Sequence, residues 1–326
     1  MFGEVQELLA PVVEAYPQDV DALNLMANAM LADGKTDEGV ELLSQVAQLQ
    51  PDSAEAKVRL GAGMIIGGTK SGAMDQIEAA LELDPEFQQA DILLILNHLE
   101  NKDYDAAIAA GKGYRRRNLD SVTPHNLLGR VYLEAGDEEE ARKSFQKALS
   151  IEPGDPTANH QFATMALQRE DTVAARGYYE AILAEHENYL PALMQLAAID
   201  AQEGNEELMV QHLEQAVDTH PQAVRPRLVL ARYLLSKGRP AGVAPLFSTL
   251  DDSVKQSPEV LQAHSTLLEA QIKLEKKQVS DVEFQEVLKE LTTQEVIVVH
   301  KYSLRDQWNM GGSSDERVDA AIADYD

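Results

Sequence analysis

The sequence has no cysteine, so disulfide bonds, thiolate metal sites and cysteine nucleophiles are excluded. Aromatic residues make up only 5% of the chain, against 44% hydrophobic residues in total, and alanine, leucine, glutamate and glutamine dominate. This composition favours helices that pack through small side chains over a sheet core. No apolar run approaches the roughly 20 residues that a membrane-spanning helix needs, so no span is expected in this sequence.

Basic residues are scarce. The chain has 28 lysines and arginines against 55 aspartates and glutamates, which gives a formal net charge of -27. DNA, RNA and anionic membrane surfaces repel a chain of this charge. The first residues, Met1 to Glu4, lack the basic and apolar regions of a signal peptide. We therefore expect a protein or peptide partner and no nucleic acid.

Prolines return at a fixed interval. Because proline breaks helices, its return at multiples of one length marks a repeated structural unit. Five prolines of the sequence follow one another at intervals of about 34 residues or twice that length. This register predicts seven complete repeats of about 34 residues. The prolines that define it are Pro17, Pro51, Pro85, Pro153 and Pro221.

Each repeat is expected to form two helices joined by a tight turn. Its seventh position carries a large apolar residue, and its eighth a small residue where the helices cross. The fifteenth position favours glycine, which adopts a positive φ after the first helix. Four residues depart from this pattern, namely Ile95 at an eighth position, Lys102 and Glu170 at fifteenth positions, and Gly111 at the bulky twenty-fourth position of the second helix.

The stretch from Pro124 to Pro153 reads PHNLLGRVYLEAGDEEEARKSFQKALSIEP and resembles the tetratricopeptide repeat nearly position for position. This resemblance implies an all-α fold, a right-handed superhelical solenoid of antiparallel helix pairs. The register predicts the second helix of a truncated repeat at 3–19, which would make the chain a fragment with any signal or anchor upstream. The other expected segments are seven repeats at 20–53, 54–87, 88–121, 122–155, 156–189, 190–223 and 224–257, a degenerate repeat or cap at 258–292, and a partly disordered tail at 293–326.

In this architecture the first helices line a concave face. Polar residues one turn either side of the large apolar residue are the candidates for partner contact, and Arg130, Arg225 and Arg232 are expected to anchor an acidic group. Simple solvated arginines are the alternative. The full set of expected contact residues is Asn24, Asn28, Asn126, Arg130, His160, Thr164, Gln195, Arg225 and Arg232. Val58, Ile65 and Ile92 suggest an apolar stretch on the same side, either for a docked peptide or for internal packing.

Catalytic chemistry is not expected. Acidic runs such as Glu138 to Glu140 fall at turns and solvated faces, and the paired glycines near Gly61 and Gly67 do not follow a strand as a phosphate loop would. His125 and His160 lie in consecutive first helices but lack a recurring carboxylate partner. We therefore expect no enzyme activity, cofactor or metal in these residues.

The run from Ala223 to Gly238, with Asn126–Leu133 and Ala141–Pro153, looks like the bacterial PEP-CTERM-system tetratricopeptide lipoproteins over about residues 5–260. This resemblance implies a non-catalytic scaffold of the cell envelope, in protein export or exopolysaccharide assembly, with the periplasm favoured over the cytoplasm. Two alternatives stay open. The repeats could recruit substrate for a larger enzyme, or the chain could self-associate into a homo-oligomer through residues 3–16 or the basic seventh repeat.

Overall fold

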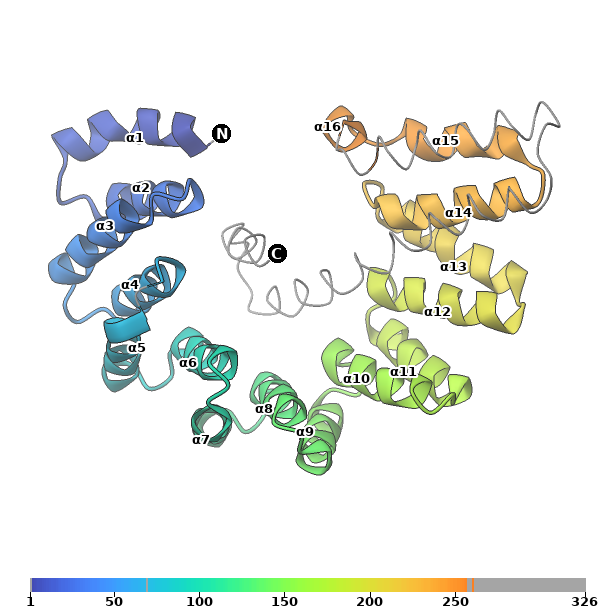
Figure 1. Cartoon of the computed structure of the whole chain (residues 1–326), viewed down its shortest axis with the longest axis horizontal. Coiled ribbons are helices and arrows are strands. Elements are labelled where there is room, and N and C mark those ends of the chain that lie inside the picture. Colours follow the sequence, from blue (N-terminus) through green and yellow to red (C-terminus); the bar gives the residue numbers. More distant parts are fainter. Residues whose placement is uncertain (1, 69, 257–259, 261–326) are drawn as a thin grey trace. The chain divides into compact units, whose positions relative to one another are not determined.

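The computed structural model describes residues 2–68, 70–256 and 260. These residues divide into two compact parts, an N-terminal part that ends at Ile151 and a C-terminal part that begins at Glu152. Every regular element among the described residues is a helix, and consecutive helices pack in antiparallel pairs (Figure 1). The chain is thus an all-α solenoid of helix pairs, as the sequence predicted.

The N-terminal part contains nine helices among its described residues. The first, α1, packs on α2, and from there each first helix pairs with the second helix that follows it. The bounds are α1 Phe2–Ala15, α2 Val20–Ala32, α3 Thr36–Leu49, α4 Ala54–Ile66, α5 Lys70–Leu83, α6 Gln88–Glu100, α7 Tyr104–Arg117, α8 Thr123–Glu134 and α9 Glu138–Ile151.

The C-terminal part continues the same alternation and then departs from it. Its described elements are α10 Pro156–Leu167, α11 Thr172–Glu185, α12 Leu190–Glu203, α13 Glu206–Thr219, α14 Val224–Ser236, the 3-10 turn η1 Pro240–Gly242, α15 Val243–Ser248 and α16 Asp252–Lys255. The second helices of the complete pairs have 14 residues, whereas α15 has only 6.

Side-chain caps mark the start of three first helices, α2, α4 and α10. The side chains of Asp19, Ser53 and Asp155, which each stand at the last position of a repeat, accept a hydrogen bond from a backbone N–H of the following helix. Such bonds satisfy donors that have no partner within the helix. The same chemistry recurs in the second helices, where the Asp171 side chain accepts from the N–H of Ala174 at 3.0 Å.

Every first helix is followed by a residue in the left-handed region of backbone space. The five glycines at this position have φ values between 66° at Gly238 and 81° at Gly136. Lys102 and Glu170, which depart from glycine in the sequence, adopt the same conformation with φ of 60° each. The turn geometry therefore persists where the sequence pattern fails.

The helix crossings are packed around the small residues. A Cβ added at Gly129 would lie 2.6 Å from the Phe145 ring. In the third repeat the sizes are exchanged, since Ile95 takes the small position and Gly111 the bulky one, and both are buried. The Leu128 side chain of the next repeat closes over Gly111, where a Cβ would approach it to 2.7 Å.

The second helix of the seventh repeat is interrupted for a local reason. Pro245 has no N–H, so a helix continuous from residue 240 would lack the bond from residue 245 to the carbonyl of Ala241. The chain instead forms η1 and starts α15 at Val243, which places Pro245 in the first turn of the helix. Val243 and Phe247 still pack in the core with Leu235 and Val260.

Two expected segments lie outside the described residues. These are the degenerate repeat or cap at 258–292, apart from Val260, and the tail at 293–326. Among the described helices, none combines the length and apolar character that crossing a bilayer requires.

Candidate functional site

The polar residues that the sequence assigned to partner contact stand on the first helices. In the N-terminal part, Asn24 and Asn28 lie one turn apart on α2, and both side chains are half-buried. Asn126 and Arg130 hold the same two positions of α8; Asn126 is buried and Arg130 is half-buried. The Nε of Arg130 donates to Glu134 at 3.3 Å, so its charge is partly engaged on its own helix.

Apolar residues occupy these positions on the two helices in between. Val58 on α4 is buried in the core, and Ile92 on α6 packs against a core cluster. Ile66, at the end of α4, is 45% exposed. Ile65, the third residue expected in this stretch, packs against the same cluster as Val58. The expected stretch therefore serves internal packing, and the neighbouring Ile66 reaches the surface.

In the C-terminal part, His160 and Thr164 lie one turn apart on α10. The Thr164 hydroxyl donates to the backbone carbonyl of His160 at 2.9 Å, and His160 Nδ1 lies 3.3 Å from the Tyr179 hydroxyl. Burial lowers the pKa of His160 and raises the pKa of Tyr179 to about 12. His160 is thus a neutral hydrogen-bonding side chain near pH 7.

The remaining three candidates stand on α12 and α14. Gln195 is half-buried on α12, and Arg225 and Arg232 are half-buried on α14. Because they are two helical turns apart, Arg225 and Arg232 lie on the same side of the helix. Arg227, in the same basic run of sequence, is instead 1% exposed and donates to backbone carbonyls inside the fold.

Models of the tetratricopeptide repeat match residues 1–61, 71–121 and 122–155 of this chain. This chain is a tetratricopeptide-repeat protein. In the sequence after these matched segments, the C-terminal part continues with further pairs of a first and a second helix. No curated protein matches the chain.

Solved structures align with this chain to different extents, and the likeness to yeast Tom70 supports the fold. Yeast Tom70 aligns with a TM-score of 0.61 at 17% identity, over 89% of this chain and 62% of Tom70. The C-terminal part of a tetratricopeptide protein from Cytophaga hutchinsonii aligns at 16% identity, over 69% of this chain and 93% of that one, with a TM-score of 0.46. MamA is 26% identical over 47% of this chain and 83% of its own, with a TM-score of 0.41.

Several charged side chains of these repeats are buried, which the sequence analysis did not predict. Asp91 is 1% exposed and pairs with Arg117, so one arginine of the basic run 115–117 is already engaged. Burial raises the pKa of Asp91, and the bond from Arg117 opposes this rise. Asp91 occupies the fourth position of its repeat, where Leu23 stands in the first. Because other repeats also carry polar or charged residues at this position, such as Lys57 and Arg227, the sequence offers no clear signal that Asp91 is buried.

A second buried acid links three helices of the C-terminal part. Asp200 is fully buried, and its carboxylate accepts from Arg176 at 2.7 Å and lies 2.8 Å from His212 Nδ1. Arg176 also donates to Glu203 at 2.8 Å. The three helices joined in this way are α11, α12 and α13, so the network holds neighbouring tetratricopeptide repeats in register.

The two histidines considered as metal ligands have separate environments. His125 is buried in the N-terminal part, and its pKa is lowered by burial and by the positive charges of Arg115 and Lys147. His160 contacts Tyr179 in the C-terminal part. Among the described residues, metal-ligand spacing occurs instead at Glu152, Glu185 and His186, whose ligand atoms all lie within 4.8 Å of one another.

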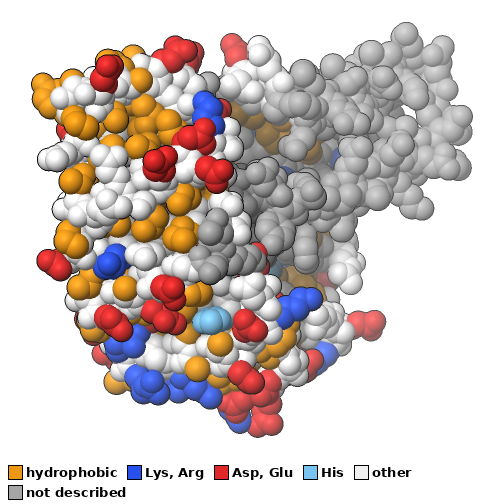
Figure 2. Space-filling model, turned by 60° about the vertical axis from the view of Figure 1, so that its left-hand side comes forward, with side chains coloured by type: hydrophobic (Ala, Val, Ile, Leu, Met, Phe, Trp, Pro, Cys, Tyr) orange, Lys and Arg blue, Asp and Glu red, His pale blue; other side chains and the backbone are white. Residues whose placement is uncertain are grey.

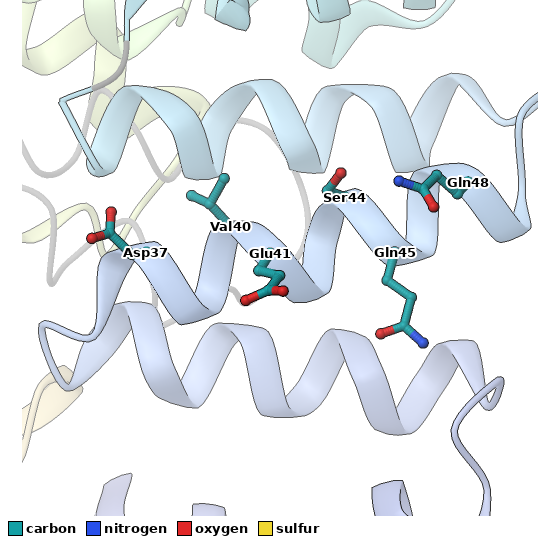
Figure 3. A pocket seen from close by; sticks show the side chains of 6 residues that line it. All are labelled: Asp37, Val40, Glu41, Ser44, Gln45 and Gln48. Carbon is teal, nitrogen blue, oxygen red and sulfur yellow. The ribbon is translucent and has the colours of Figure 1, made fainter.

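An open depression with a volume of about 500 Å³ lies on α3 (Figure 3). Figure 3 shows that all of its lining side chains come from this one helix, and Val40 is the sole apolar member. Small-molecule sites are lined mostly by apolar side chains and enclose their ligand. We therefore regard the depression as a surface feature of one second helix and not as a small-molecule site. Its lining residues are Asp37, Val40, Glu41, Ser44, Gln45 and Gln48.

Proposed function

We propose that this protein is a non-catalytic scaffold that holds a peptide or protein segment on the face formed by its first helices. The observation that carries the proposal is the placement of Arg225 and Arg232 on one side of α14, two turns apart. In a chain of net charge -27, this side of α14 is suited to an acidic partner segment. Gln195 on α12 and His160 on α10 supply hydrogen-bonding groups on the preceding first helices.

The partner is expected to belong to a bacterial cell-envelope export or exopolysaccharide assembly. This part of the proposal is supported by the resemblance of the run from Ala223 to Gly238 to the PEP-CTERM-system lipoproteins. The same run forms α14, so the segment that carries the resemblance also carries the two arginines.

The test is a crosslinking pull-down from envelope fractions with the wild-type chain and an Arg225→Glu, Arg232→Glu variant. The control is Arg169→Glu, Arg239→Glu, which makes the same change in charge at exposed turn residues of the same part of the chain. We expect the first variant to lose the captured protein and the control to retain it. Equal capture by both variants would contradict the proposed face.

Self-association is a second candidate function, and the exposed face of α1 favours it. No residue of α1 is buried, and its large apolar side chains Leu8 and Phe2 are 74% and 41% exposed. Figure 2 shows hydrophobic side chains at the surface between acidic ones on the face it presents. A Leu8→Glu variant should remove concentration-dependent association in light scattering, and a wild-type chain that stays monomeric at high concentration would exclude this function.

A further inference from the structure

Two glutamates and one histidine meet at the end of α11. Glu185 is the last residue of this helix, His186 caps it, and Glu152 lies in the turn before α10. The Nε2 of His186 lies 3.4 Å from Glu152 Oε1, and the ligand atoms of all three residues lie within 4.8 Å of one another. Glu152 and His186 occupy the same position of consecutive repeats, so the repeat itself brings them together.

A glycine leaves room for the Glu185 side chain. Gly154 is buried beneath this side chain, and a Cβ at Gly154 would lie 2.7 Å from both Cβ and Cδ of Glu185. The glutamate thus runs across a surface that only glycine leaves open, and its carboxylate lies near Glu152 and His186. A freely solvated surface glutamate has no such constraint.

No lysine or arginine among the described residues forms an ion pair with the two carboxylates. Among the ion pairs of the described residues, Glu152 pairs with His186 alone, and Glu185 pairs with no lysine or arginine. The last turn of α11 contains no basic residue, so the negative end of the helix dipole adds to the two carboxylates. Two carboxylates and a helix end at this spacing favour a bound cation.

We propose that Glu152, Glu185 and His186 bind a divalent transition-metal ion, with zinc as the best fit. A mixed set of one imidazole and two carboxylates suits zinc, whereas calcium and magnesium prefer oxygen ligands alone. Ligand atoms around a tetrahedral zinc lie about 3.3 Å apart, as follows from bonds of about 2.0 Å. The 3.4 Å between Glu152 and His186 matches this value, and the exposed Glu185 carboxylate can close the remaining gap.

The bound ion would fasten the turn before α10 to the end of α11. Three protein ligands leave one position for water or for a group from a partner. The site lies off the first-helix side chains that carry the proposed binding face, so the two proposals are independent. A metal clip of this kind would stiffen the fifth repeat without contributing a catalytic residue.

Equilibrium dialysis and calorimetry with zinc alone test the site on the whole chain. We expect one zinc per chain, and we expect His186→Gln, Glu152→Gln and Glu185→Gln each to raise the dissociation constant at least about tenfold. Gly154→Ala should weaken binding as well, because it displaces Glu185. The controls are Glu180→Gln, an exposed residue of α11, and His220→Gln, which stands at the same position one repeat later.

Several outcomes would overturn the site. The wild-type chain could bind no zinc saturably, or His186→Gln could bind it as tightly as the wild type. The control variants could weaken binding as much as the ligand variants, or calcium at equal concentration could displace the zinc. Circular dichroism of each variant shows whether the fold is intact. Because the three ligand side chains are at least partly exposed, we expect their variants to keep the helix content of the wild type.

Discussion

The Nε of Arg227 donates a hydrogen bond of 2.8 Å to the carbonyl oxygen of Leu246. In a regular helix this carbonyl would accept from the N–H of Leu250, but that N–H bonds to Phe247 at 3.4 Å and α15 ends. Arg227 also donates to the carbonyl of Ala223 at 2.6 Å. A buried guanidinium thus satisfies the Leu246 carbonyl that the interrupted second helix leaves open, and joins it to the start of α14.

Replacing Arg227 with leucine is therefore expected to destabilise the seventh repeat. Leu23 and Leu193 occupy the same position of their repeats and are fully buried, so leucine fits by size. The loss comes from carbonyls left without a donor, and we expect about 2–4 kcal/mol in urea unfolding. Hydrogen exchange should accelerate in residues 243–250. The exposed Arg239→Leu should change stability by less than about 0.5 kcal/mol, and equal effects of the two variants would contradict this role.

Among the described residues, two that are not glycine have a positive φ, and replacing them is expected to stabilise the protein. Lys102 and Glu170 each adopt a φ of 60°, which costs an ordinary residue about 1 kcal/mol and glycine almost nothing. Lys102→Gly and Glu170→Gly should each stabilise the protein by about 0.5–1 kcal/mol in urea unfolding. Gly136→Ala, at the same position with φ of 81°, should destabilise it by a similar amount. A loss of stability in both glycine variants would show that the Lys102 and Glu170 side chains do more than tolerate the turn.

Much of the fold followed from recurrence in the sequence, because the residues that return at the same position of each repeat are those that cap helices, cross them and turn the chain. Residues that depart from the repeat pattern could not be explained by recurrence. Ile95 and Gly111 each break the pattern, yet the larger side chain of Ile95 on one helix compensates for the missing side chain of Gly111 on the other. The Leu128 side chain fills the remaining space. Compensation between side chains distant in sequence is visible only in the structure.

The candidate site was predictable to a smaller degree. The helical register places Arg225 and Arg232 on one side of α14, whereas the burial of Arg227 between them in sequence did not follow from composition. Charged residues were assumed to be solvated, and Asp91 and Asp200 violate this assumption because each is buried and pairs with an arginine. Glu152 and His186 form a pair only because consecutive repeats stack.

Two glycines of α7 should respond oppositely to the same substitution. A Cβ at Gly111 would lie 2.7 Å from Leu128, so Gly111→Ala forces the Leu128 side chain to move and should cost about 1–3 kcal/mol. At Gly113 a Cβ would meet only arginine side-chain atoms, at 3.7 and 3.9 Å. Gly113→Ala should therefore stabilise the helix by about 0.5–1 kcal/mol, because alanine is the better helix former. Thermal melts of the two variants compare them directly, and a shift of the same sign in both would contradict the packing at Gly111.

Burial of His125 makes stability depend on pH in a defined direction. Its pKa in the folded protein is lowered from 6.5, so on acidification the unfolded chain binds a proton before the folded protein does. The free energy of unfolding should therefore fall as the pH drops through about 6.5, by at most about 1.4 kcal/mol per pH unit for this one group. Leucine is fully buried at the same position in the first and sixth repeats, as Leu23 and Leu193. We expect His125→Leu to reduce the slope of the free energy of unfolding against pH between pH 7 and 5.5, as measured by urea titrations. The difference in stability between the two proteins at pH 8 reports the effect of the substitution on packing alone. An unchanged slope would mean that His125 gains access to solvent protons without unfolding.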